Sequence, residues 1–155
     1  MAKWMKTIST SIQEFIEKQQ MFFVATAATN DKVNISPKGL DSLKVLDKNR
    51  VVWLNLGGSG NETERQILET NRMTLMFCAF EGNPLILRLY GTAKIIRPED
   101  DQWKEVLSLF PTSPRARQIF DVHVEDVQTS CGYGVPFYQY QAQREKLTVP
   151  KIKKT

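Results

Sequence analysis

The chain has 155 residues and a mass of 17.8 kDa, a length typical of a single domain. Hydrophobic residues make up 41% of it and charged residues 25%, which argues against intrinsic disorder, a collagen helix or a coiled coil. Because no run of 18 apolar residues occurs, we expect no membrane-spanning helix and no membrane partner.

The net charge of +4 comes from the end of the chain. Residues 144–155 contain five basic side chains and one acidic one, which leaves sixteen of each in the rest of the sequence. We therefore expect one domain over residues 1–140 and a basic tail over residues 141–155. A neutral body lacks the basic face of a nucleic-acid-binding domain, so nucleic acid is not an expected partner.

The few cysteines and histidines limit the chemistry further. Cys78 and Cys131 are far apart, and His123 is the only histidine, so neither a disulfide framework nor a structural zinc site is expected. His123 alternates with two valines, which predicts a solvent-facing position on a strand. The N-terminus does not resemble a signal peptide, and we therefore expect a reducing, cytoplasmic compartment.

The pattern of apolar and polar residues predicts the elements in chain order. Ser9 or Thr10 caps a first helix that places Ile12 and Ile16 on one face. Strands are then predicted at residues 21–27, at 33–36, where Pro37 ends the strand, and at 51–56, followed by a helix from 61 to about 69. Two more strands follow at 73–80 and at 85–96, the second of which is bent at Gly91. The last elements are a helix that opens at 98–101, a short helix over 114–120 and a strand at 122–130. About six strands predict a mainly β fold, a small β-barrel with helices packed outside.

A run of glycines between the strand at 51–56 and the next helix is the first candidate site. Free backbone N–H groups and the positive end of a helix dipole at such a junction can hold a phosphate. Ser59, Asn61 and Thr63 add short polar side chains there. A capping box, formed by Asn61 with Glu64 or by Ser59 with Glu62, explains the same residues without any ligand.

Two further segments are candidates. Lys38 stands between Pro37 and Gly39 at the end of a strand, where its ammonium could offset a phosphate or negative charge on a reduced ring. The alternative is a solvated lysine in a turn. In residues 130–136, two glycines flank Tyr133 and would let the backbone approach a flat ligand, although a tight turn around a packed tyrosine fits equally well. Cys131, in the same loop, is read as an inert thiol.

Taken together, these segments resemble the pyridoxamine 5'-phosphate oxidase-related, FMN-binding split-barrel family. The resemblance spans roughly residues 10–140 and runs in order through residues 23–27, 33–39, 52–55, 58–63, 71–77, 87–91 and 130–136. It implies a homodimer of split β-barrels with FMN at the subunit interface. Where the better-known oxidases carry an Arg-Lys pair, this sequence has Gly60 and Asn61, so pyridoxamine phosphate itself is not taken as the substrate.

The resemblance also implies the cofactor-binding residues. They are Asn34, Ile35, Ser36, Pro37, Lys38 and Gly39 beside the flavin, Trp53, Leu54 and Asn55 along the ring and ribityl chain, Ser59, Gly60, Asn61 and Thr63 at the phosphate, and Cys131, Gly132 and Tyr133 reaching the ring from the same or the other subunit. Lys38, or backbone N–H groups near it, would stabilise the reduced flavin. The implied function is an FMN-binding oxidoreductase with an unknown substrate. The alternatives are a non-catalytic flavin-binding or sensing module and a related ligand, such as haem or a deazaflavin.

Overall fold

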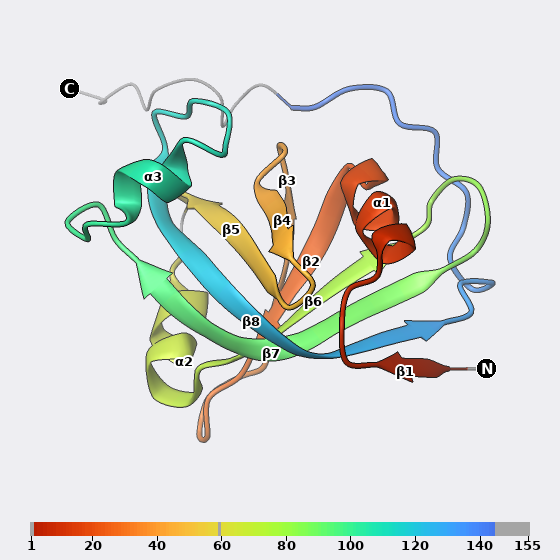
Figure 1. Cartoon of the computed structure of the whole chain (residues 1–155), viewed down its shortest axis with the longest axis horizontal. Helices are drawn as coiled ribbons and strands as arrows, with labels where there is room; N and C mark the ends of the chain where they lie inside the picture. Colours follow the sequence, from red (N-terminus) through yellow and green to blue (C-terminus); the bar gives the residue numbers. More distant parts are fainter. Residues whose placement is uncertain (1, 59, 145–155) are drawn as a thin grey trace.

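A computed structural model describes residues 2–58 and 60–144, which form one antiparallel sheet with three helices around it (Figure 1). The elements are β1 (Lys3–Met5), α1 (Thr10–Lys18), β2 (Met21–Thr26), β3 (Asn34–Gly39), β4 (Leu43–Asp47), β5 (Arg50–Leu56), α2 (Glu62–Thr70), β6 (Arg72–Cys78), β7 (Ile86–Ile96), α3 (Trp103–Leu107) and β8 (Ala116–Ser130). The strand order is β3-β2-β6-β7-β8-β5-β4, and β1 pairs with β8. The mainly β barrel with outer helices is therefore confirmed.

The two long strands, β7 and β8, pair with each other over Ile86–Ile96 and Ile119–Ser130. Their register shifts between Tyr90 and Gly91, which is the irregularity predicted at Gly91. A side chain at Gly91 would collide with the carbonyl oxygen of His123 on β8, so only glycine fits this close approach. The sheet is not closed into a full barrel, because its two end strands, β3 and β4, share no ladder in the described part of the chain.

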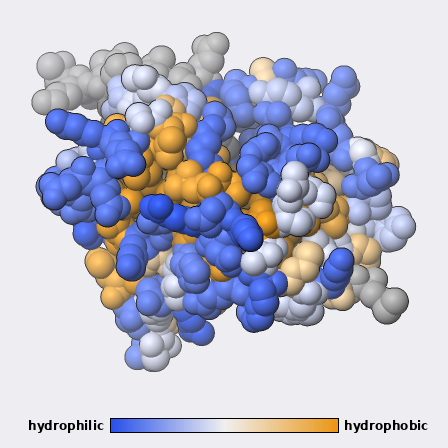
Figure 2. All heavy atoms as spheres, in the orientation of Figure 1, coloured by the Kyte–Doolittle hydropathy of each residue, from blue (hydrophilic) through white to orange (hydrophobic). Residues whose placement is uncertain are grey.

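Apolar side chains lie on both sides of this sheet. The main core fills the barrel and includes Val24, Trp53, Phe77 and Phe120. A second cluster, with Ile119 at its centre, packs β5, β7 and β8 against α3 on the outside. Figure 2 shows apolar atoms in the middle of the viewed face and toward α3. The outer face of β5 is therefore covered by this protomer itself.

The two longer helices lie at opposite ends of the curved sheet (Figure 1). The first of them, α1, begins as predicted: Ser9 Oγ accepts a hydrogen bond from the Ile12 N–H at 3.3 Å, and Ile12 and Ile16 are buried. The other, α2, follows the glycine turn and buries Gln66 and Ile67. We call these two regions the α1 end and the α2 end of the barrel.

Some sequence predictions are wrong. The described residues contain eight strands rather than about six, because β1 and β4 are short and half-exposed and lack a clear apolar alternation. The predicted helix at 114–120 is the start of β8, where Ile119 and Phe120 are fully buried between β5 and β7. Long-range pairing decides the structure of this segment, and the local sequence does not reveal it.

Two boundaries also differ. Pro37 does not end β3 but pairs with Phe23 inside it. The missing N–H is tolerated because β3 is an edge strand. The acidic segment that was expected to open a helix forms turns, and α3 covers only Trp103–Leu107. No helix in the described ranges is long and apolar enough to cross a membrane. Most of the predicted basic tail, residues 145–155, lies outside the described residues.

Candidate functional site

One side of β3 faces the barrel interior. Three of its residues lie opposite buried residues of β2: Asn34 opposite Thr26, Ser36 opposite Val24 and Lys38 opposite Phe22. Residues directly opposite each other on paired strands point to the same face, so these three candidate side chains turn inward. The other predicted contacts on this strand point the other way: Ile35 is 60% exposed, and Pro37 is exposed too.

The start of β3 meets the first turn of α2. Asn34 Nδ2 donates to Thr63 Oγ1 at 3.0 Å and to Thr26 Oγ1 at 3.3 Å. Thr63 is buried although it is a polar residue in the first turn of a helix. Two segments that the sequence singled out separately are therefore in direct contact.

Lys38 lies on the open side of the barrel, between the end strand β3 and strand β5; we call this place the seam. Its Nζ is 5.2 Å from the centre of the Trp53 ring, a cation–π distance. Burial lowers the pKa of Lys38, and the negative charge of Glu62 at the start of α2 acts in the opposite direction. Within the described ranges, no hydrogen bond or ion pair engages this ammonium. Lys38 is therefore a half-buried cation beside the Trp53 ring, with no hydrogen-bond or ion-pair partner among the described residues.

Strand β5 divides its three candidates between the two faces of the sheet. Trp53 and Asn55 point inward, and the Trp53 ring stacks on Phe120 with centroids 4.7 Å apart. Trp53 Nε1 is the one fully buried side-chain nitrogen or oxygen, among the described residues, that has no hydrogen-bond partner. Leu54 faces outward into the cluster under α3, so it is not available to a ligand that lies inside the seam.

The glycine turn is held by the start of β8. The Gly57 N–H donates to the Arg115 carbonyl at 2.7 Å, and Arg117 Nη1 donates to the Gly60 carbonyl at 3.1 Å. Arg117 is a candidate that the sequence reasoning missed, because its segment was read as a helix instead of a strand beside β5. Ser59 lies outside the described residues.

Asn61 precedes α2, but it does not form the predicted capping box. Its side chain makes no capping hydrogen bond to the helix backbone. Instead, Asn61 Nδ2 donates to the Glu64 carboxylate, and Asn61 Oδ1 accepts from Gln118 Nε2 at 3.0 Å. Gln118, which is buried, thus fixes the beginning of α2 against β8, and the backbone N–H groups of the first turn stay available.

The third predicted segment lies elsewhere. Residues 131–133 follow β8 on the right of Figure 1, whereas α2 lies at the lower left. Gly132 packs so closely on the backbone of Leu85 that a Cβ there would be 2.5 Å from the Leu85 nitrogen. Tyr133 is 85% exposed, and Cys131 is an exposed free thiol. Within one protomer, this loop does not join the other candidates.

The geometry therefore gathers most candidates at one place. They lie around β3, β5 and the turn that leads into α2, and the side chains on the two strands point inward. The set is Asn34, Ser36, Lys38, Trp53, Asn55, Gly60, Asn61 and Thr63. Gly39 ends β3 and lies nearer to the α1 end. A Cβ added to it would be 3.0 Å from the Gln20 carbonyl oxygen. The gathered set combines donors, one free cation and an aromatic wall, which suits an anionic ligand with a flat ring.

Comparison with known proteins identifies the family of this chain. The family model described as pyridoxamine 5'-phosphate oxidase matches residues 8–131. The pyridoxamine 5'-phosphate oxidase family protein ustO of Aspergillus flavus is 33% identical over 136 residues, which cover 84% of this chain and 55% of that protein. The chain therefore spans about half the length of this curated relative.

Solved structures share the fold at lower identity. HupZ of Group A Streptococcus has a TM-score of 0.60 at 21% identity, covering 77% of this chain and 91% of its own. The heme storage protein HutZ of Vibrio cholerae has a TM-score of 0.57 at 14% identity, covering 83% and 99%. An FMN-binding protein of Syntrophomonas wolfei has a TM-score of 0.50 at 15% identity, covering 73% and 79%. By the extent of the family match and the identity to its curated relative, this chain belongs to the pyridoxamine 5'-phosphate oxidase family.

Proposed function

We propose that this protein binds FMN at the α2 end of the barrel and works as a flavin-dependent oxidoreductase whose substrate is not specified. The phosphate would lie at the first turn of α2, and the ring would extend along the seam between β3 and β5. The single observation that carries the proposal is the contact between Asn34 and Thr63, which brings the two candidate segments to one place.

The residues at this place fit a phosphate. The first helical hydrogen bond of α2 runs from the Arg65 N–H to the Asn61 carbonyl, so the N–H groups before Arg65 have no helical partner. Two cations lie near the turn: Arg117 donates to the Gly60 carbonyl, and Lys38 interacts electrostatically with Glu62 of the first turn of α2. The carboxylate of Glu62 lies against Gly60, and this exposed side chain would rotate away to admit an anion.

Aromatic side chains of the core lie beside the position proposed for the ring. The stacked pair of Trp53 and Phe120 forms a rigid apolar wall, and the unpaired Trp53 Nε1 is a donor for a ring oxygen or nitrogen. When bound, FMN would supply the electron- or hydride-transfer chemistry. Lys38 would hold a positive charge beside the ring and stabilise the negative charge that reduction adds. Burial of the wall excludes water from one face of the ring.

We further propose that the protein is a homodimer in which a second copy of the chain covers the flavin site. The seam supplies one wall for a ring. Apolar side chains are exposed on the outer side of β3, where Ile35 is 60% exposed, and on the loop after β8, where Tyr133 is 85% exposed. In a homodimer the partner would cover such residues, and the loop at 131–133 could then approach the site of the other protomer. Two free cysteines agree with a reducing compartment, and we place the protein in the cytoplasm as part of this proposal.

Haem is the ligand named for the Vibrio neighbour, but flavin suits this chain better. His123 is the only histidine, and it is exposed on the outer side of β8, whereas the gathered candidates face the seam. A haem site at the α2 end would therefore have no histidine ligand from this chain. Titration with haemin beside FMN separates the two: haemin should not displace bound FMN.

The test is an FMN titration of the purified protein, followed by flavin absorbance and fluorescence. We expect saturable binding at micromolar concentration, and Arg117→Ala should weaken FMN binding roughly tenfold, about 1.4 kcal/mol. Riboflavin, which has no phosphate, should bind weakly and be insensitive to this change. Arg72→Ala, an exposed arginine beyond the other end of α2, is the matched control. Absence of FMN binding would refute the cofactor assignment.

A separate measurement addresses catalysis. With FMN bound, NADH or NADPH should reduce the flavin under anaerobic conditions, and an added electron acceptor should reoxidise it. A flavin that stays bound and is reduced by neither would show a binding module and not an oxidoreductase. The sedimentation of the same sample tests the dimer, which a purely monomeric species would contradict.

A further inference from the structure

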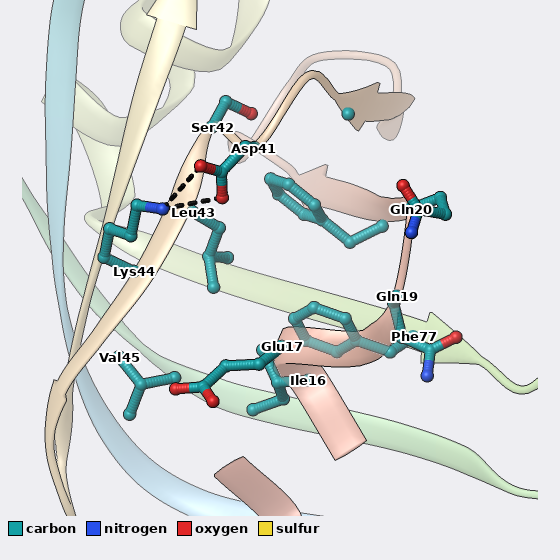
Figure 3. A pocket seen from close by; sticks show the side chains of 12 residues that line it. Ile16, Glu17, Gln19, Gln20, Asp41, Ser42, Leu43, Lys44, Val45 and Phe77 are labelled. Atoms are coloured by element: carbon teal, nitrogen blue, oxygen red, sulfur yellow. Dashed lines mark hydrogen bonds and ion pairs between the residues drawn. The ribbon is translucent and has the colours of Figure 1, made fainter. Parts of the chain in front are cut away.

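A cavity of about 260 Å³ opens at the α1 end, away from the proposed cofactor site. It lies between the C-terminal half of α1 and β4, where the two end strands of the sheet part (Figure 3). None of the inward-facing candidates at the α2 end lines it, and Gly39 is the one predicted site residue that does. The cavity is therefore distinct from the site described above.

The floor of the cavity is the barrel core itself. Phe22, Phe77 and Ile16 line it and are at most 5% exposed, and the rings of Phe22 and Phe77 stack with centroids 5.7 Å apart. Leu43 of β4 lines the opposite wall (Figure 3). An apolar group that entered here would extend the core and lose contact with water, which favours binding.

The rim of the cavity carries negative charge. Asp41 and Lys44 neutralise each other, with Lys44 Nζ 2.6 Å from Asp41 Oδ1. Glu17 forms no ion pair within residues 2–58 and 60–144: one of its carboxylate oxygens accepts a hydrogen bond from the neutral Gln13 amide at 2.8 Å. Figure 3 shows the Glu17 side chain reaching from α1 toward Val45 on the other side of the opening.

The helix adds to this charge. The nine-residue helix α1 points its C-terminal end at the cavity, because Gln19, which caps it, is a lining residue. The C-terminal end of a helix dipole is negative and attracts cations within the last turn. Glu17 and the helix end therefore act in the same direction at the opening, and Lys18, the basic residue of the same last turn, does not line the cavity.

We propose that this cavity binds small amphipathic organic cations, in which a primary ammonium is attached to an aromatic or branched aliphatic group. The apolar group lies on Phe22 and Phe77, and the ammonium lies at the rim beside Glu17 and the C-terminal end of α1. This binding site is independent of FMN, so it stands or falls separately from the proposed cofactor.

The test compares two probes of nearly equal size and opposite charge, 3-phenylpropylamine and 3-phenylpropionate. Each is titrated into the full-length protein, and backbone amide shifts are followed by NMR. The amine should bind with an affinity at least about fivefold higher than the acid, and the shifts should concentrate at Ile16, Gly39 and Leu43. Equal affinities, shifts elsewhere or no saturable binding of the amine would each overturn the proposal.

Two variants locate the charge and the cavity. Glu17→Gln should weaken amine binding about twofold to fivefold and strengthen the weak acid binding, because the carboxylate that attracts the ammonium also repels the acid. Glu14→Gln, the same change at an exposed position of the same helix that does not line the cavity, is the control and should change neither. Val45→Phe, which fills the opening, should abolish amine binding while the spectrum remains that of a folded protein. If Glu14→Gln and Glu17→Gln had equal effects, the rim would not be the binding site.

Discussion

The two ends of the barrel are built from different side chains, although the same strands run between them. At the α2 end, buried polar residues such as Gln66, Gln118 and Thr63 connect strand, loop and helix by hydrogen bonds. At the α1 end, Phe22 and Phe77 form an apolar floor below a charged rim. Hydrogen bonds fix direction and apolar contacts supply most of the stability, so we assign precise ligand positioning to the α2 end.

The largest loss of stability should come from a substitution in the apolar floor at the α1 end. Phe77→Ala removes a ring that is 1% exposed and leaves a cavity in the main core. We expect it to lower the free energy of unfolding by about 3–5 kcal/mol. Urea unfolding followed by circular dichroism measures the change. A loss no greater than that of an exposed substitution would contradict the role given to this end.

A smaller loss of stability is expected from a substitution among the buried polar residues of the α2 end. Gln66 is buried, its Oε1 accepts from Thr26 Oγ1 at 2.7 Å, and its Nε2 donates to the Lys32 carbonyl at 2.8 Å. A third bond runs from Nε2 to Asp31 Oδ2 at 2.8 Å. Gln66→Leu removes all three hydrogen bonds and should cost about 1–3 kcal/mol. The same urea measurement applies. If Gln66→Leu cost more than Phe77→Ala, the comparison between the two ends would be reversed.

The smallest effect is the pH dependence of stability that the charge of Lys38 causes. Burial lowers its pKa below the value of 10.5 in the unfolded chain, so the unfolded state binds more protons between the two pKa values. The wild-type protein should therefore gain stability, relative to Lys38→Met, as the pH rises from the lowered pKa toward 10.5.

Unfolding of both proteins from pH 7 to pH 10.5 checks this sign. Lys38→Met should be the more stable of the two at pH 7, and the difference should shrink with rising pH. Lys94→Met, at an exposed position on β7, is the control and should show no such trend. A difference that grows with pH would mean that Lys38 is stabilised by a partner in the folded protein.

The sequence predicts the apolar end of the molecule better than the polar end. The apolar, β-prone run of β2 and the helical spacing of Ile12 and Ile16 are local patterns, and both elements form where they were expected. The bend at Gly91 was also correct, because only a close approach of two strands requires a glycine there. The order of the candidate segments indicated the family, and the family model confirms it.

The polar end depends on contacts between distant parts of the chain, which local patterns do not contain. Arg117 lies beside Gly60 only because β8 pairs with β5, and this segment had been read as a helix. Asn61 was expected to cap α2, but Gln118, 57 residues further along, engages it instead. The inward orientation of Lys38 likewise follows from the pairing of β3 with β2. The candidate residues could be chosen from the sequence, but which of them face one another could not.

One measurement tests most directly whether the α2 end is the flavin site. In an FMN titration followed by backbone amide NMR, the resonances of Gly60, Thr63 and Lys38 should shift together and saturate at one FMN per protomer. Those of the cavity at the α1 end, such as Ile16 and Leu43, should move little. Shifts confined to the α1 end, or no shifts at all at saturating FMN, would contradict the account.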